Sequence, residues 1–132
     1  MRAIWYIILF IWQLPQNIVG LCFLLFCKFA KIKVDRKNGV YVIDKFWAGG
    51  VSLGEFIFIK SSCFEPDTVK HECGHRIQSH ILGPFYLIIV GIPSACLCMA
   101  AAHSYKLSKN YYKYYPENWA NKLGGVDRDI DV

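Results

Sequence analysis

Two long apolar stretches dominate the pattern of the chain, at residues 3 to 29 and 81 to 102. Each has enough residues to cross a hydrocarbon core about 30 Å thick. The polar segment QLPQN interrupts the first, and the second is interrupted by Gly83-Pro84 and by GIPS around Pro93. Proline removes a helical hydrogen bond, so we expect each stretch to form two half-helices.

The segment between the apolar stretches has strand character. KNGVYVI begins with Asn38-Gly39, a tight-turn signal, and both this run and GEFIFIK are rich in β-branched and aromatic residues. The glycine-rich AGGVSLG between them predicts a turn. Together these features predict a small β-hairpin over residues 32 to 60.

Two further helices are expected outside the apolar stretches. The run FEPDTVKHECGHRIQSHILGP has a proline and an aspartate at its start and Gly-Pro at its end, which predicts a helix over residues 66 to 82. In the tail, a proline followed eight residues later by Gly-Gly predicts a short helix over residues 116 to 124.

The composition favours a membrane protein. Hydrophobic residues make up 55% of the 132 and charged residues only 19%, which is more apolar than an ordinary globular domain. We expect a mainly α membrane protein with a small β-hairpin. Residues 1–30 would be an N-terminal membrane anchor, and residues 31–132 a domain with a second membrane-embedded segment at 81–102. A secretory signal peptide is the alternative for residues 1–30, although no small-x-small cleavage site follows.

The basic residues indicate an orientation. The net charge is +5, only Arg2 precedes the first apolar stretch, and five basic residues follow it: Lys28, Lys31, Lys33, Arg36 and Lys37. By the positive-inside rule the connecting segment faces the cytosol, which in a bacterium means the inner face of the cell membrane. A solvated charge run is the alternative. No nucleic-acid motif is present, and we expect no nucleic-acid partner.

Cysteine usage gives no disulfide framework. Four of the six cysteines lie in the apolar stretches, where cysteine behaves as a small hydrophobe. This placement suits a reducing compartment or lipid. A pairing of Cys63 with Cys73 is the alternative.

The pentapeptide HECGH carries the candidate chemistry. On a helix, His71 and His75 lie about 40° apart and project from one face. Two such imidazoles can hold a zinc ion, while Glu72 can reach a water bound to that ion and act as general base. The alternative is a pair of helix histidines beside an acid, and a third ligand distinguishes the two.

Two residues are candidates for the third ligand. His80 points about 180° away from His71 on an unbroken helix. Glu117 is better placed, because the tail helix also carries Ala120 and Asn121 at i+3 and i+4. The small residue lets two helices approach, and the amide can bond the outer nitrogen of a ligand histidine.

HExxH followed on a later helix by ExxAN resembles the gluzincin type of zinc metallopeptidase. From about residue 11 to 126 the layout is also similar to a group of small bacterial membrane proteins. The resemblance implies a minimal zincin-like core, with His71, His75 and Glu117 as zinc ligands, Glu72 as general base and Asn121 holding a ligand histidine. Asn121 departs from the aspartate that is common there.

Two further departures accompany the resemblance. Cys73 stands where an aromatic residue is usual, and we interpret it as packing, with a thiolate ligand as the alternative. The domain is also very small, which leaves little room for a walled substrate cleft.

For His75 and Glu117 to meet, the chain has to turn back. We expect this turn at Pro93, as a re-entrant hairpin that puts the metal near the cytosolic interface; the alternative is a return of residues 103 to 117. QLPQN either joins the site or is a kink satisfied by its own backbone. The tyrosines before Glu117 either anchor the protein at the interface or supply a phenol to an oxyanion.

The sequence therefore predicts a membrane-embedded zinc metallopeptidase in the cell membrane, which hydrolyses peptides or membrane proteins with Glu72 as base. The strand at residues 54 to 60 is expected to bind an extended substrate by β-addition. One alternative is a non-catalytic metal-binding membrane protein that serves as a scaffold or binds a partner. Another is a membrane-disrupting peptide, which leaves the ordered HExxH and glutamate set unexplained. Nothing in the sequence indicates an oligomeric state.

Overall fold

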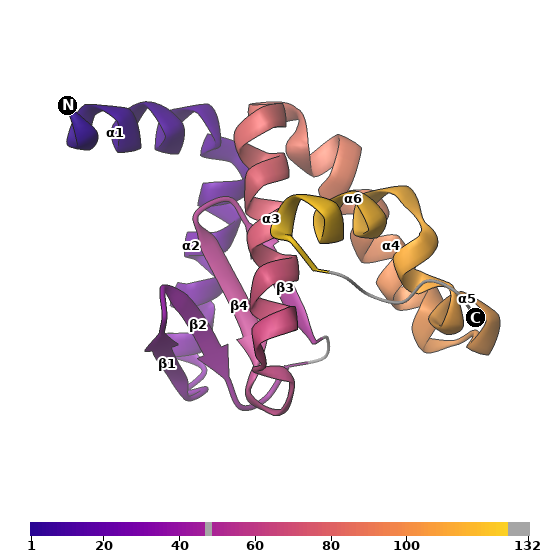
Figure 1. Ribbon diagram of the computed structural model, residues 1–132. Coiled ribbons are helices and arrows are strands. Elements are labelled where there is room, and N and C mark those ends of the chain that lie inside the picture. Colours follow the sequence, from indigo (N-terminus) through magenta and orange to yellow (C-terminus); the bar gives the residue numbers. More distant parts are fainter. Residues whose placement is uncertain (47–48, 127–132) are drawn as a thin grey trace.

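A four-stranded sheet lies between two long helices (Figure 1). The computed structural model describes residues 1–46 and 49–126. Helix α2 (Leu14–Phe29) packs against one face of the sheet and α3 (Pro66–Leu82) against the other. The bounds of α3 are those that its proline and its Gly-Pro predict.

The sheet corrects the prediction of a single hairpin. Strands β1 (Val34–Lys37), β2 (Val40–Ile43), β3 (Gly50–Leu53) and β4 (Phe56–Lys60) lie in the order β1-β2-β4-β3. The tight turn expected at Asn38-Gly39 connects β1 and β2 in one hairpin, and β3 and β4 form a second one. The two segments expected to pair as a hairpin, β2 and β4, pair in parallel instead. Successive apolar residues in β2 and β4 are buried on both faces, as central strands require.

The glycine-rich segment is a strand where the sequence predicts a turn. Within it, β3 pairs with β4 from Gly50 to Leu53. Val51 and Leu53 pack on the cluster beneath α2, while Gly50 lies against Glu72 of α3. The alternation of these side chains between two packed helices outweighs the low strand propensity of glycine.

Each face of the sheet carries its own apolar cluster. Beneath α2, Leu24 and Cys27 pack on Ile43 and Phe58. Beneath α3, half-buried Cys73 joins a cluster formed by Val40, Val42, Ile57 and Ile59. Cys73 is therefore a packing residue, as we interpreted it.

The first apolar stretch breaks where QLPQN predicts. Helix α1 (Arg2–Trp12) meets α2 at 88°. The polar side chains of the break bond to other parts of the protein. Gln16 Nε2 donates to Ser79 Oγ at 2.7 Å and to the Gly83 carbonyl at 2.8 Å, and Asn17 Oδ1 accepts from the Glu55 amide at 2.8 Å. These bonds fix the bend to α3 and to the β3–β4 turn, away from the metal ligands.

The second apolar stretch turns at Gly83, and the predicted turn at Pro93 is wrong. A 3-10 turn (Gly83–Phe85) follows α3, and a π-helical turn (Leu87–Gly91) then runs directly into α4 (Ile92–Ala102). Gly83 has a φ of 56°, and a Cβ there would lie 2.1 Å from Trp12, so the turn requires glycine. Pro93 lies in the first turn of α4, where a missing N–H is tolerated.

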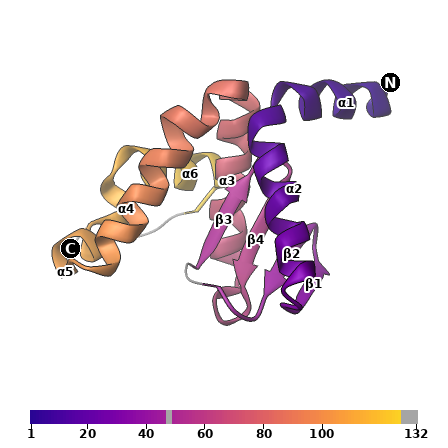
Figure 2. The same ribbon diagram turned by 180° about the vertical axis from the view of Figure 1, so that it is seen from behind.

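The tail then returns to α3 through α5 (Tyr105–Lys109), a 3-10 turn (Tyr111–Lys113) and α6 (Tyr115–Gly124). Another 3-10 turn (Ser61–Cys63) precedes α3. Figure 2 shows α4 descending from the top of α3, and α6 beside α3. Gly125 ends α6 in the left-handed conformation, as the Gly-Gly pair predicts.

Helices make up most of the fold. Among the described residues, no single helix combines the length and apolar character needed to cross a bilayer. The bent pair α1 and α2 meets both conditions only when its two helices are taken together.

Candidate metal centre

Helices α3 and α6 meet through their backbones. A Cβ on Gly74 would lie 1.9 Å from the Ala120 carbonyl oxygen, and a Cβ on Gly124 would lie 2.0 Å from the Lys70 carbonyl oxygen. Ala120 itself is fully buried, as expected for the small residue of the tail helix. This close approach allows side chains on the two helices to converge.

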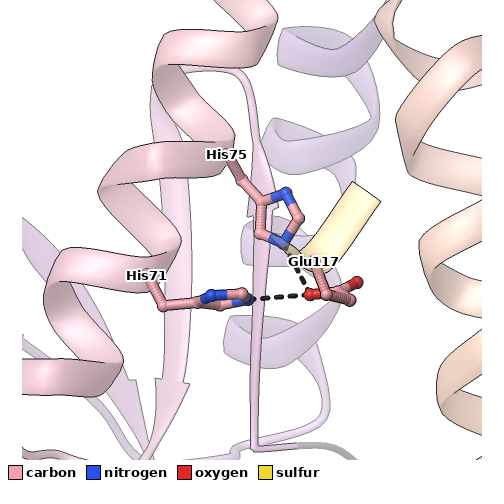
Figure 3. Close-up of side chains that lie close together, drawn as sticks. All are labelled: His71, His75 and Glu117. Atoms are coloured by element: carbon pink, nitrogen blue, oxygen red, sulfur yellow. Dashed lines mark hydrogen bonds and ion pairs between the residues drawn. The ribbon is translucent and has the colours of Figure 1, made fainter. Parts of the chain in front are cut away.

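Three predicted ligands meet at this contact (Figure 3). The Nε2 atoms of His71 and His75 lie 2.8 Å and 3.1 Å from the same Glu117 oxygen, Oε2. All three side chains are buried, and their ligand atoms lie within 4.8 Å of one another. The structure thus brings together the three residues that the sequence proposed as ligands, whereas His80 bonds to Glu55 at 2.8 Å instead.

Amide oxygens orient both imidazoles. The Nδ1 atom of His71 lies 2.6 Å from Asn121 Oδ1, and the Nδ1 atom of His75 lies 2.7 Å from Gln78 Oε1. The Gln78 Nε2 group donates to the Pro116 carbonyl at 3.0 Å, which turns Oε1 toward His75. An amide oxygen can only accept, so each Nδ1 carries the proton and each Nε2 is left to bind a cation.

Sequence reasoning found Asn121 but missed Gln78. The signal was present, because Gln78 stands three residues after His75 on the same helix and so near the same face. It also missed Ser94 of α4, whose hydroxyl donates to the second Glu117 oxygen, Oε1. No spacing in the sequence connects Ser94 with α6.

The charges of the group are strongly coupled. Burial alone raises the pKa of Glu117, but hydrogen bonds from both imidazoles and from Ser94 outweigh it and hold this carboxyl well below its usual value. Burial lowers the pKa of His75, but the bond with Glu117 and the nearby Glu72 carboxylate together raise it to about 8. The site therefore holds an ionised carboxylate that demands a neighbouring positive charge, either a proton or a cation.

The geometry suits a tetrahedral cation. Ligand atoms bound at about 2.0–2.1 Å in a tetrahedron lie roughly 3.3 Å apart. The measured separations of 2.8 Å and 3.1 Å differ from this by a few tenths of an ångström. Imidazole nitrogen and carboxylate oxygen are donors that zinc accepts readily, and the three protein ligands leave a fourth position for water. The group could thus hold a metal ion.

Two cavities meet at Glu72. The larger, about 490 Å³, has a mixed lining that includes Ser62, Thr68 and Ser108 as well as Ala101 and Ala102. The smaller, about 230 Å³, is mainly apolar and reaches His75 and Glu117. Gly50, Glu72, Cys98 and Tyr111 line both. The expectation of little room for a cleft is therefore wrong, because α4 supplies a wall opposite β3 and α3.

The four tyrosines before Glu117 differ in position. Tyr111 lines both cavities, and Tyr112 packs edge-on against His71 with ring centroids 5.4 Å apart. Tyr114 and Tyr115 are exposed, and the Tyr115 hydroxyl donates to the Ile89 carbonyl. Tyr111 is thus the phenol of this group that faces both cavities.

Comparison of the chain with models of protein families, with curated proteins and with solved structures gives no match. The chemistry of the site accordingly rests on its residues and their geometry.

Proposed function

We propose that the protein is a membrane-associated zinc metallopeptidase. The observation that carries this proposal is the convergence of two oriented imidazoles and a buried carboxylate, from α3 and α6, beside a cleft that also contains Glu72. A site that served only to connect two helices would need neither the cleft nor this second carboxylate.

His71, His75 and Glu117 would hold the ion. Zinc in such a site lowers the pKa of water toward about 7 and polarises a carbonyl group. Asn121 and Gln78 keep the two imidazoles in the tautomer that presents Nε2. Ser94 fixes the remaining oxygen of Glu117, so that Oε2 stays directed at the histidines.

Glu72 would be the general base. Its side chain is buried, lines both cavities and acts electrostatically on His75. The carboxylate takes a proton from water as the water oxygen bonds to the peptide carbonyl carbon. It then delivers that proton to the amide nitrogen as the C–N bond breaks. The products are one carboxylic acid, which then ionises by giving its proton to the amine, and one amine, and Glu72 returns to its ionised form.

Tyr111 would stabilise the oxyanion that develops on the carbonyl. Burial, together with the charges of Glu117 and Glu72, holds its pKa far above the usual value, so the phenol stays protonated and can donate. A preorganised donor in a site shielded from water contributes more than the same donor in solvent.

The substrate cannot add to β4, which corrects the expectation from sequence. β4 is paired with β2 on one side and with β3 on the other. β3 is the edge strand next to β4, and its Gly50 lies against Glu72. An extended peptide would therefore lie along β3, between this strand and α4.

The experiment is metal analysis and a peptidase assay on purified protein. Wild type and Glu72→Gln should each retain zinc, while Glu72→Gln should lose about 10²–10⁴-fold in hydrolysis. Glu117→Ala should lose the metal. Asp67→Asn is the control, because this exposed carboxylate stands five residues earlier on the same helix. It should behave as wild type.

Two results would refute the assignments. Unchanged turnover in Glu72→Gln would remove this residue as the base. Full zinc content in Glu117→Ala would remove the metal centre. A protein that binds zinc but hydrolyses no peptide would instead be a metal-binding scaffold.

A further inference from the structure

A broad apolar surface covers α1, the outer face of α2 and the turn that leads into α4. Helix α1 buries none of its residues. Large apolar side chains are exposed on all three elements, among them Trp5, Ile8, Ile18, Phe26, Phe85 and Ile88. A surface of this extent marks an interaction site.

The polar groups of the same segment face inward. Residues 3–27 contain no charged side chain. Gln13 and Gln16 are fully buried and Asn17 is 1% exposed, and all three are bonded inside the protein. In this segment the polar side chains are buried and the apolar side chains are exposed. This arrangement is the reverse of the one expected in water, and it suits a lipid environment.

Lipid also explains the shape of the surface. A protein partner would cover one side of α1, whereas the consecutive residues Ile4 to Ile8 are all exposed, and five consecutive helical positions extend around every side of the helix. The basic residues that flank the apolar run, Arg2 on one side and Lys28, Lys31 and Lys33 on the other, suit anionic headgroups. The surface is thus complementary to a bilayer in both polarity and charge.

The apolar cavity opens onto this surface. Ile92 lines that cavity and is 59% exposed beside Ile88 and Ile89. The larger cavity, of mixed polarity, lies on the other side of Glu72, toward the first turn of α3. The lining of the cleft therefore becomes more polar with increasing distance from the apolar surface.

The candidate metal centre lies close to the apolar surface. His75 stands seven residues before Leu82, where α3 reaches the exposed Ile81 and Phe85. At 1.5 Å per residue the separation along the helix is about 10 Å. About three extended residues span that distance.

We propose that the substrate is a polypeptide anchored in a lipid bilayer, cut within a few residues of the membrane surface. This inference rests on the proposed peptidase function. Apolar side chains nearest the anchor enter the cavity lined by Val51, Leu87 and Ile92. The polar residues that follow occupy the larger cavity.

Membrane docking is tested without catalysis. Glu72→Gln protein should float with vesicles of phosphatidylethanolamine and phosphatidylglycerol. Two further substitutions in the same protein, Trp5→Glu and Ile88→Glu, replace side chains that are 59% and 69% exposed. Together they should lower the fraction of protein bound to vesicles about tenfold or more. Tyr105→Glu is the control, because Tyr105 is 84% exposed on α5 and should be neutral. A protein that forms a dimer without lipid and does not float with the vesicles would overturn the proposal. The apolar surface would then be an interface with a second copy of the chain.

Substrate choice is tested with one reporter sequence placed about 3, 10 or 20 residues from a transmembrane anchor, or left unanchored. Wild type should cut the shortest spacer at least about tenfold faster than the longest. Equal rates on all four reporters would overturn the inference and leave the peptidase function intact. No cleavage of any reporter by zinc-loaded protein would overturn both.

Discussion

Replacement of Gly74 by alanine tests whether the metal centre depends on the backbone contact between α3 and α6. In an ordinary helix interior this change stabilises by about 1 kcal/mol, because alanine has the higher helix propensity. At Gly74 the added Cβ would lie 1.9 Å from the Ala120 carbonyl oxygen, whereas an ordinary contact begins at 3.4 Å. The helices would have to separate by the difference, about 1.5 Å.

The separation acts on both stability and metal binding. Overpacking of this kind costs about 1–3 kcal/mol, so the free energy of unfolding should fall although the propensity rises. Metal–ligand distances tolerate only about 0.2 Å. A 1.5 Å shift would therefore withdraw Glu117 of α6 from the two histidines of α3. We expect Gly74→Ala to lose most of its zinc.

Elemental analysis and urea unfolding with a chelator present measure the two effects separately. Lys70→Ala is the matched control, since its side chain is exposed one turn earlier on α3, and it should retain the metal. The reasoning would be refuted by a Gly74→Ala protein that holds one equivalent of zinc and unfolds at higher urea than wild type.

Three further predictions concern the surroundings of the site. Gln78→Leu removes the acceptor for Nδ1 of His75, whereas Gln78→Glu keeps an acceptor oxygen at this position. In competition with a chromophoric chelator, the leucine variant should bind zinc about 10–100-fold more weakly than the glutamate variant. Equal zinc affinities of the two variants would exclude an orienting role for Gln78. Tyr111→Phe should keep its zinc but lose about 10²-fold in kcat, and an unchanged kcat would exclude the phenol. The bond with His80 holds the pKa of Glu55 below its ordinary 4.5, so ionised Glu55 stabilises the fold above that pH, and this stabilisation is lost as pH falls through the lowered pKa. In urea with a chelator, Glu55→Gln should therefore be less stable than wild type by up to about 1 kcal/mol at neutral pH and equal to it in acid, and a pH-independent difference would contradict this.

Local signals in the sequence predicted the elements that build the site. Proline and Gly-Pro mark the ends of α3, and the periodicity of HECGH places His71 and His75 on one face. The pattern around Glu117 predicted its helix and also Asn121, which bonds to His71. These features depend on residues a few positions apart, where helical geometry is fixed.

Features that depend on distant partners were not predictable in the same way. The parallel pairing of β2 with β4 joins segments that no local alternation connects. Both Gly83 and Pro93 can end a helix. The chain turns at Gly83 because Trp12 packs against this residue so closely that any side chain at position 83 would clash with it. Ser94 reaches Glu117 only because α4 returns along the cleft.

Two hydrogen bonds from outside the helix cap the last turn of α3. Trp12 Nε1 donates to the His80 carbonyl at 3.0 Å, and Gln16 donates to the Gly83 carbonyl. Helix ends normally fray, and fraying spreads inward from carbonyls without partners. Here the end nearest His75 cannot unwind unless the junction of α1 and α2 detaches first. Loss of His75 as a ligand through unwinding of this end of α3 would therefore require a large cooperative opening, so fraying would contribute little to the release of a bound ion.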